Sequence, residues 1–372
     1  MKIIADNKIP FLKGVLEASA EVIYVPGPEI SAAMLKDVDA LIVRTRTQCD
    51  AGLLEGSKVK FIATATIGFD HIDADYCTAK GIKWANAPGC NSGSVMQYIA
   101  AVLVHLSTKY NFDYSEKTIG IVGVGNVGSK VVRMASLFGM KVLMNDPPRE
   151  RKEGKSEFVS WKEIQKKADI ITFHVPLNRD GVDKTYHLFD DEFVKELKPG
   201  VIIINSSRGE VVSNAILKKA LMENKIKAAV LDVWENEAEI DSELLRLVEI
   251  GTPHIAGYSA DGKAMGTAMS VQALSRFFNL NLNNWFPENI PSPKDDNIKI
   301  NAEGLTTREV INKAILTTYN IIRDDETLRN SISTFEKQRG DYLIRREFNA
   351  FKINLINDDK NNLNILRQLG FR

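Results

Sequence analysis

The 372-residue chain has no excess of charge of either sign, because 48 lysines and arginines balance 48 aspartates and glutamates. Without a net positive field, such a chain has no general means of attracting nucleic acid or an anionic membrane. No apolar run approaches the roughly 18 residues of a membrane span, and Asp6 comes too early for the apolar core of a signal peptide. We therefore expect no nucleic-acid partner, no membrane association and a cytoplasmic location.

Cysteine is also scarce: only Cys49, Cys77 and Cys90 occur, with no CxxC pair. This odd and unpaired set favours a reducing compartment. No histidine or cysteine lies near Cys49 or Cys77 at metal-ligand spacing, so we interpret both as small buried apolar side chains. The sequence predicts no metal site.

What is present suits a large α/β protein. The length exceeds what one hydrophobic core usually supports, so two or three domains are expected. Short apolar runs without polar alternation predict buried parallel strands, and the stretches between them have helical spacing. The runs lie at residues 2–5, 22–25, 40–43, 61–64, 118–122, 141–144, 169–174, 201–205 and 227–232. The predicted helices include 29–38, 73–80, 92–108 and 261–280.

These elements predict two Rossmann-like, doubly wound parallel-sheet domains. Residues 1–92, completed by 258–282, would form one, and residues 93–257 the other. Asn, Pro and acidic residues at 281–297 indicate a linker. Beyond it, residues 286–372 predict a small α+β domain, with a helix at 307–322 and two β-like runs within 342–356. So small a domain is expected to pack on something else, and a partner subunit is the natural candidate.

A glycine-rich turn follows the strand at 118–122 and precedes a helical stretch that begins at Ser129. Gly123 permits the tight turn, Gly125 lets a pyrophosphate approach the backbone, and Gly128 packs helix against strand. The helix N-terminus then offers N–H groups to phosphates. This context favours a dinucleotide site over an ordinary tight turn.

Asp146 ends the following strand, near the position at which a carboxylate accepts hydrogen bonds from the adenosine ribose. A carboxylate there should repel a 2′-phosphate, which favours NAD over NADP, although Arg149 and Arg151 leave NADP open. The alternative interpretation is a turn residue before Pro147 and Pro148.

Three segments that end buried strands carry unusual polar residues. Arg208 lies in the first, Glu237 in the second and His254 in the third. Oxidation of an alcohol by hydride loss needs a base, and histidine suits that task near neutrality. A neighbouring carboxylate would orient the imidazole, and an arginine would bind a substrate carboxylate. Each residue alone has a structural explanation, but together they predict a catalytic site in which the three groups converge on the nicotinamide across an interdomain cleft.

The order of these motifs resembles the D-isomer-specific 2-hydroxyacid dehydrogenases. The resemblance rests on 123–128, 207–209, 232–237 and 253–254, and it covers nearly 260 N-terminal residues. It implies NAD-dependent oxidation of a small phosphorylated 2-hydroxy acid. The expected reaction converts 4-phospho-D-erythronate to (R)-3-hydroxy-2-oxo-4-phosphooxybutanoate in pyridoxal 5′-phosphate (vitamin B6) biosynthesis, by a homodimer joined through the C-terminal domain. Ala238 departs from the family, in which a proline commonly follows the catalytic glutamate.

The resemblance also assigns roles to individual residues. Arg208 and Glu237 would be catalytic, with His254 as the proton donor or acceptor. The NAD contacts would come from Gly123, Gly125, Asn126, Val127, Gly128, Asp146, Val175, Ser206, Ser207, Asp232 and Gly257. Thr45, Thr66 and Tyr258 would contact substrate. His71 is expected to organise a turn under the substrate loop.

A phosphorylated substrate needs cationic donors. Arg44 or Arg46, with help from Arg345 or Arg346 of a partner subunit, is our hypothesis for the phosphate site, although each could be a solvated surface charge. Two other functions stay open: a related dehydrogenase, for example one that acts on 3-phosphoglycerate, and an NAD-sensing binding module.

Overall fold

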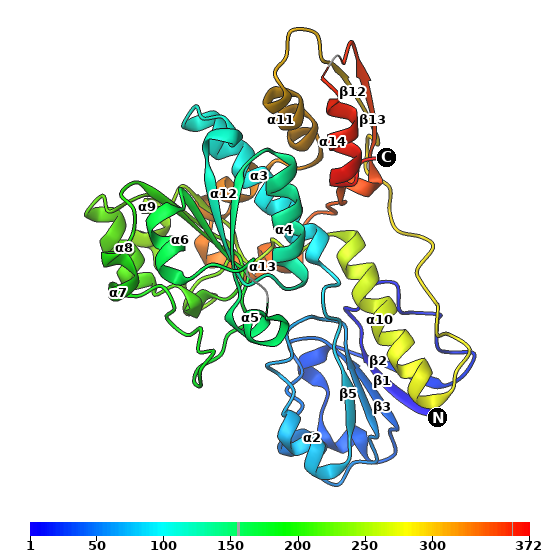
Figure 1. The fold of residues 1–372 in the computed structure, drawn as a ribbon. Coiled ribbons are helices and arrows are strands. Elements are labelled where there is room, and N and C mark those ends of the chain that lie inside the picture. Colours follow the sequence, from blue (N-terminus) through cyan, green and yellow to red (C-terminus); the bar gives the residue numbers. More distant parts are fainter. Residues whose placement is uncertain (155–156, 359) are drawn as a thin grey trace. The chain divides into compact units, whose positions relative to one another are not determined.

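The computed structural model describes residues 1–154, 157–358 and 360–372 (Figure 1). It divides into two compact units. Met1–Asn91 and Ser259–Pro291 form the first, and Ser92–Tyr258 with Ser292–Arg372 form the second. The sequence predicts the C-terminal segment as a separate domain, but the structure groups it with the predicted nucleotide-binding domain. Among the described residues, no helix is long and apolar enough to cross a membrane.

The first unit contains a five-stranded parallel sheet. Its strands, in spatial order, are β2 (Glu21–Val25), β1 (Lys2–Asp6), β3 (Ala40–Val43), β4 (Phe61–Thr64) and β5 (Lys83–Ala85). The first four match the predicted strands. α10 (Ala260–Phe278) packs on β4, where the rings of Phe277 and Phe61 stack with centroids 4.8 Å apart. After the second unit, the chain thus returns to pack on the sheet of the first.

The prediction of a helix at 29–38 is wrong. Only two short 3₁₀ helices form there, η1 (Gly27–Glu29) and η2 (Ala32–Leu35). Pro26 and Pro28 each lack a backbone N–H, and Ser31 makes no side-chain capping bond to η2. The helix at 73–80 does form, as α2 (Ala74–Lys80), because Asp73 caps it and Gly81 ends it.

The two buried cysteines of this unit behave as expected. Cys49 and Cys77 are both fully buried in one apolar cluster, and both are free thiols. Burial raises the pKa of the Cys49 thiol to about 12, so this thiol stays protonated at neutral pH. In the described part of the chain, no group of three or more His, Cys, Asp or Glu side chains is placed to bind a metal.

The second unit contains a six-stranded parallel sheet. Its spatial order is β11 (Ile250–Gly251), β10 (Ile226–Leu231), β9 (Val201–Asn205), β8 (Ile170–Phe173), β6 (Thr118–Val122) and β7 (Lys141–Asn145). The order reverses between β6 and β8, and ligands of such sheets bind at the carboxyl ends beside this reversal. The two Rossmann-like sheets predicted from sequence are therefore confirmed.

Seven helices described in the second unit connect or cover these strands. They are α3 (Ser92–Lys109), α4 (Asn126–Leu137), α5 (Pro147–Glu153), α6 (Trp161–Lys167), α7 (Asp191–Lys195), α8 (Asn214–Met222) and α9 (Ser242–Leu247). α3 is the predicted helix at 92–108. Most of its residues are buried, and it packs on α4.

The C-terminal segment corrects two predictions. Its sheet pairs β12 (Asn297–Asn301) with β13 (Lys352–Ile356), and β12 begins at the last residue of the predicted linker. The first β-like run, before Arg345, forms no strand. The helix predicted at 307–322 is instead split into α11 (Thr307–Thr318) and α12 (Ile321–Asn330), because Asn320 caps the second helix.

The C-terminal segment packs on its own chain. Ile298 and Ile311 belong to the same apolar core as Ile99 and Val131, which lie on α3 and α4. α11 packs directly on α3. The segment therefore buries much of its apolar surface within its unit, without the partner subunit that its small size suggested.

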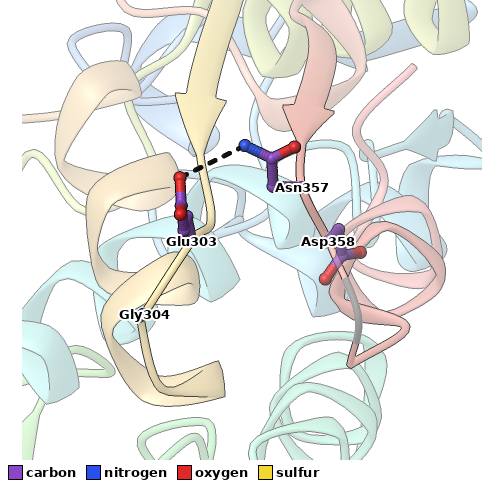
Figure 2. Close-up of a pocket in the computed structure, with 4 residues that line it drawn as sticks. All are labelled: Glu303, Gly304, Asn357 and Asp358. Atoms are coloured by element: carbon purple, nitrogen blue, oxygen red, sulfur yellow. Dashed lines mark hydrogen bonds between the residues drawn. The ribbon is translucent and has the colours of Figure 1, made fainter.

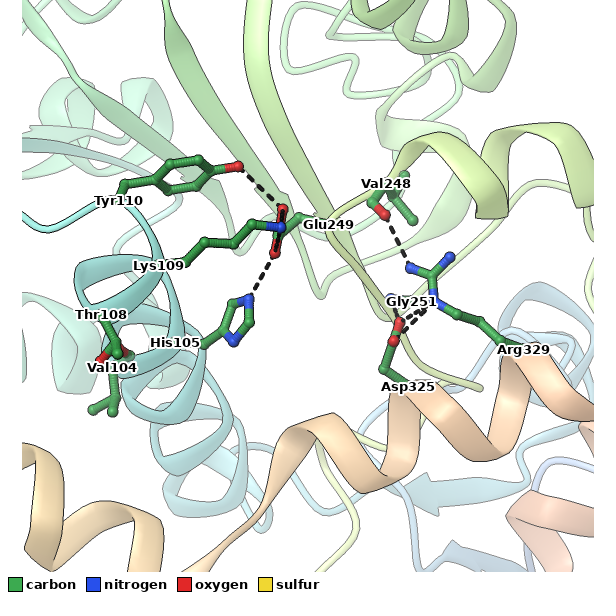
Figure 3. A network of polar contacts seen from close by, with 10 residues as sticks. All are labelled: Val104, His105, Thr108, Lys109, Tyr110, Val248, Glu249, Gly251, Asp325 and Arg329. Carbon is green, nitrogen blue, oxygen red and sulfur yellow. Dashed lines mark hydrogen bonds and ion pairs between the residues drawn. The ribbon is translucent and has the colours of Figure 1, made fainter.

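A polar network ties α3 to the strand edge that leads to the predicted catalytic histidine (Figure 3). Glu249, just before β11, accepts hydrogen bonds from His105 at 2.7 Å, Lys109 at 2.7 Å and Tyr110 at 3.0 Å. Burial alone would raise the pKa of Glu249, but these partners outweigh it and hold that pKa at about 2. The ionised carboxylate therefore stabilises the fold.

Glu249→Gln should lower the free energy of unfolding near neutral pH by up to about 3 kcal/mol. The pKa of Glu249 in the folded protein lies below its ordinary value of 4.5, so this stabilisation is complete above pH 4.5 and is lost as the pH falls toward 2. Denaturant unfolding should therefore show a difference between the variant and wild type that shrinks over this window. The control is Glu243→Gln, because that side chain is 69% exposed. A difference that is constant with pH would contradict the assignment.

Candidate active site

His254 and Glu237 form a direct pair in the second unit. The His254 Nδ1 atom lies 2.7 Å from a Glu237 carboxylate oxygen. Both side chains are partly exposed, His254 by 32% and Glu237 by 20%. His254 has φ of +55°, and its backbone N–H donates to the carbonyl of Asp232 at 2.7 Å. A histidine in the left-handed region is uncommon, so the surrounding contacts must hold it there.

Glu237 is an ionised hydrogen-bond acceptor. Its other oxygen accepts the backbone N–H of Trp234 at 3.0 Å. Burial by itself would raise the pKa of Glu237, but the hydrogen bond and charge of His254 outweigh that effect and lower it. An ionised carboxylate only accepts hydrogen bonds, so the proton between the pair belongs to Nδ1 of His254. Nε2 is then the nitrogen that can exchange a proton with a substrate.

A buried carboxylate holds the loop that carries His254. Asp232 is 1% exposed and accepts the backbone N–H groups of Ile255 at 2.8 Å and Ala256 at 2.9 Å. It also accepts the Thr252 hydroxyl at 2.7 Å. Burial raises the pKa of Asp232, opposed by His254 and by these hydrogen bonds. Both oxygens are thus used within the protein, and contact of Asp232 with NAD stays a prediction.

Arg208 lies on the neighbouring loop, just after β9. Asn205 shapes this loop, since its side chain donates to the Arg208 carbonyl at 2.9 Å and accepts the Ser207 N–H at 3.1 Å. The Arg208 guanidinium donates to the Ser207 carbonyl at 2.9 Å. A Cβ on Gly209 would lie 2.0 Å from the Trp234 carbonyl oxygen, so only glycine lets this loop pack against the loop that leads to Glu237.

The three predicted catalytic residues therefore share one edge of one sheet. Arg208 follows β9, Glu237 follows β10, and His254 follows β11. The structure supplies an arginine for a carboxylate and a histidine for a hydroxyl proton, with a glutamate that orients the histidine. This set of groups suits proton abstraction from a 2-hydroxy acid.

The glycine turn fits a dinucleotide. Gly123 has φ of +83°, and a Cβ there would meet the His174 carbonyl oxygen at 2.7 Å. A Cβ on Gly128 would lie 2.0 Å from the Gly123 carbonyl oxygen, whereas one on Gly125 would meet nothing within 4 Å. The first and third glycines thus allow close packing, and the second leaves open space for a pyrophosphate. α4 begins at Asn126 with no side-chain cap on its N–H groups.

Asp146 binds the protein itself at this turn. One carboxylate oxygen accepts the Val124 N–H at 2.8 Å, and the other accepts the Arg149 N–H at 3.1 Å, which caps α5. The Arg149 guanidinium bonds Glu153 and the Val124 carbonyl. These bonds agree with the alternative interpretation of Asp146 as a turn residue. Its contact with the adenosine ribose stays a prediction.

The other predicted cofactor residues lie around the same edge. Ser206 follows β9, and its buried hydroxyl oxygen has no hydrogen-bond partner among the described residues. Val175 follows β8, and its side chain lies next to Gly123. Ser207 is buried, and Val127 lies in the first turn of α4. Gly257 ends the His254 loop. An unsatisfied buried hydroxyl is costly, so Ser206 is a natural donor to a ligand.

The predicted substrate residues divide between the units. Thr66 belongs to the first unit, where its hydroxyl contacts Thr64 at 2.7 Å and donates to the Gly68 carbonyl at 2.9 Å. His71 contacts Thr64 at 3.0 Å, which agrees with its predicted role in organising this turn. Thr45, Arg44 and Arg46 follow β3 in the same unit. Tyr258 belongs to the second unit.

The remaining histidines have structural surroundings. Burial lowers the pKa of His174 to about 3, so it stays neutral. His187 contacts Glu235 at 2.6 Å, and Glu235 in turn accepts the N–H of Asn214 at 2.8 Å. His105 belongs to the Glu249 network. The hydrogen bonds described for these three side chains go to groups other than His254 and Glu237.

Two arginines of the C-terminal segment lie near the site, and sequence reasoning missed one of them. This is Arg339 of α13 (Phe335–Gly340), which hydrogen bonds to Tyr258. Burial would lower the pKa of Arg339, but Tyr258, Glu336 and Glu237 raise it. The hypothesis that Arg345 or Arg346 of a partner subunit helps to bind the phosphate is wrong for Arg345, which is 6% exposed and donates to Ala256 of its own chain. No local signal distinguishes either arginine from a surface residue.

A separate hollow lies at the ends of β12 and β13. It is lined by Glu303, Gly304, Asn357 and Asp358, and Asn357 donates to Glu303 at 3.5 Å (Figure 2). No predicted site residue lines it, and two carboxylates make it unsuited to an anionic substrate. The strand edge with His254 is therefore the candidate active site.

Comparisons with known proteins show which family this chain resembles. A family model described as "D-isomer specific 2-hydroxyacid dehydrogenase, NAD binding domain" matches residues 103–256, and one described as a domain of unknown function matches residues 290–370. A solved D-lactate dehydrogenase from Aquifex aeolicus, complexed with NAD and lactic acid, is 27% identical, with a TM-score of 0.63 over 78% of this chain and 100% of that chain.

The chain belongs to the D-isomer-specific 2-hydroxyacid dehydrogenases and is an NAD-dependent oxidoreductase. Its full-length relatives carry a more particular name. A protein of Bacteroides thetaiotaomicron named erythronate-4-phosphate dehydrogenase is 52% identical over 95% of this chain and 99% of its own length. One of the same name from Escherichia fergusonii is 40% identical over 100% of this chain and 98% of its own length.

The glycine turn offers a matched pair of substitutions. Gly125→Ala should leave the melting temperature nearly unchanged, because its Cβ meets nothing within 4 Å, and should weaken NAD binding by about tenfold or more if the open space holds the pyrophosphate. Gly128→Ala should destabilise the fold, because its Cβ meets backbone at 2.0 Å. Thermal unfolding and NAD titration measure both effects. Unchanged NAD affinity in folded Gly125→Ala would remove this turn from the cofactor site.

Proposed function

We propose that this protein oxidises the 2-hydroxyl of 4-phospho-D-erythronate with NAD⁺, forming (R)-3-hydroxy-2-oxo-4-phosphooxybutanoate in vitamin B6 biosynthesis. The single observation that carries this proposal is the pair formed by His254 and Glu237, with Arg208 on the adjoining loop. The names of relatives that are 40% and 52% identical support the choice of substrate.

The residues of this chain divide the work as follows. Nε2 of His254 takes the proton of the 2-hydroxyl, and Glu237 stabilises the imidazolium that results. The guanidinium of Arg208 binds the substrate carboxylate and polarises the forming carbonyl. Bound NAD⁺ would accept the hydride that leaves C2. It would be held by the glycine turn, the N–H groups of α4 and the Ser206 hydroxyl.

The phosphate and the assembly belong to the same proposal. Arg44 or Arg46 would bind the substrate phosphate, because both follow β3 beside Thr45, itself a predicted substrate contact. We also propose a cytoplasmic homodimer joined through the C-terminal segment. Leu343 and Ile344 of that segment are 61% and 64% exposed, an apolar pair that a second subunit would cover.

Another D-2-hydroxyacid dehydrogenase activity is the nearest alternative. It is favoured by the likeness to the D-lactate enzyme, which is 27% identical. An NAD-sensing module has less support, because the Arg208, Glu237 and His254 set is complete.

A panel of 2-hydroxy acids distinguishes these functions. Cofactor fluorescence should report NADH formation with 4-phosphoerythronate, and dephosphorylated erythronate and 3-phosphoglycerate should be at least about tenfold poorer in kcat/KM. Arg44→Ala should reduce the preference for the phosphorylated acid if Arg44 binds the phosphate. Faster turnover of D-lactate or 3-phosphoglycerate would replace the substrate, and no turnover of any 2-hydroxy or 2-oxo acid would favour the sensing module.

His254→Asn should lower kcat by about 10²-fold or more while NAD still binds, because it removes the base and leaves the glycine turn intact. Asparagine tolerates the left-handed backbone of this position. The matched control is His187→Asn, since His187 also has positive φ, also pairs with a carboxylate and is similarly exposed at 34%. Equal activity of the two variants would reject His254 as the base.

A further inference from the structure

We propose that the C-terminal segment, residues 292–372, positions the catalytic loop of its own chain through Arg345. This role goes beyond dimer formation and gives a catalytic purpose to a segment that matches only a domain of unknown function. It deepens the proposed function, because it concerns the loop that carries His254.

Arg345 contacts the backbone of Ile255 and Ala256, the two residues that follow His254. Its guanidinium donates to the Ala256 carbonyl at 2.5 Å and lies 3.5 Å from the Ile255 carbonyl. Asp232 accepts the N–H groups of the same two residues. The peptide groups next to His254 are therefore held from one side by a buried carboxylate and from the other by a buried guanidinium.

A second layer of the C-terminal segment holds Arg345. Its guanidinium carbon lies 4.4 Å from the centroid of the Tyr319 ring. The hydroxyls of Tyr319 and Tyr342 both donate to Asp324, at 2.8 Å and 2.6 Å. Asp324 and Asp232 supply the negative charge that balances the buried arginine. Arg345 is only 6% exposed, so the charges of these two carboxylates offset part of the cost of burying its own charge.

The same segment also contacts the end of the loop. Arg339 hydrogen bonds to Tyr258, and the Tyr342 ring meets the Tyr258 ring edge-on, with centroids 6.0 Å apart. Three side chains of the C-terminal segment therefore contact Ile255, Ala256 and Tyr258. Arg345 is a positioning residue, because it acts on substrate only through this loop.

A second arginine, Arg329, anchors the C-terminal segment to the nucleotide-binding domain at another place. Arg329 of α12 pairs with Asp325 and donates to the Val248 carbonyl at 2.9 Å (Figure 3). It also donates to the Leu245 carbonyl at 2.5 Å. Like Arg345, Arg329 donates to backbone carbonyls of the nucleotide-binding domain. An aspartate of α12 lies near each of the two arginines, Asp325 near Arg329 and Asp324 near Arg345. These partners all lie outside the loop after His254, so Arg329 provides a matched control.

Arg345→Met keeps much of the side-chain volume and removes the donors. At a temperature well below both unfolding transitions, we expect kcat to fall about 30-fold or more, with NAD affinity changed less than about threefold. Arg329→Met should lower the melting temperature and keep kcat within about threefold of wild type. Equal losses of kcat in the two variants would reduce Arg345 to a structural anchor and overturn the proposal, as would wild-type kcat in Arg345→Met.

Hydrogen exchange supplies a readout that does not depend on the substrate. The amides of Ile255 and Ala256 should exchange faster in Arg345→Met than in Arg329→Met, even if 4-phosphoerythronate proves not to be the substrate. If Arg345→Met does not fold, Arg345→Lys decides, because a lysine keeps the charge but loses the planar fork. Faster exchange with a lower kcat supports the proposal, and wild-type values of both overturn it.

Discussion

The active-site edge depends on one interaction, the acceptance of loop N–H groups by the buried Asp232 carboxylate. A carboxylate that is only 1% exposed is costly to bury unless it accepts hydrogen bonds, and here Thr252, Ile255 and Ala256 donate them. The cost is offset only when the loop has one conformation. That conformation includes the positive φ of His254 and leaves its imidazole beside Glu237. The orientation of the proposed base therefore follows from the burial of a different residue.

Two close approaches of backbone complete the arrangement. Gly209 lets the Arg208 loop pack on the peptide after Trp234, and Gly251 lets β11 pack beside the Trp234 ring. The Trp234 indole in turn donates to the Thr252 carbonyl at 3.0 Å. Three strand ends are thus joined through one tryptophan and two glycines. Because such contacts tolerate little displacement, the loops of Arg208, Glu237 and His254 are held as a group.

Much of the fold and the chemistry could be predicted because the signals are local. Continuous apolar runs such as 201–205 specify strands buried on both faces, and the glycine spacing specifies the turn after β6. Other features have no local signal. β11 has only two residues, and β12 alternates Ile298 and Ile300 with polar residues beside a proline-rich stretch, so it resembles a linker. The burial of Arg345 depends on contact with a residue 89 positions away, which no pattern near Arg345 and Arg346 indicates.

In the proposed reaction, Nε2 of His254 lies at the substrate hydroxyl, and Glu237 and Asp232 hold the imidazole and its loop in place. A crystal structure with NADH and an unreactive analogue of 4-phosphoerythronate tests this placement most directly. We predict that Nε2 lies within about 3 Å of the oxygen on C2, with Glu237 still on Nδ1 and Arg208 on the carboxylate. An analogue bound with C2 turned away from His254, or an imidazole that has left Glu237, would contradict the account.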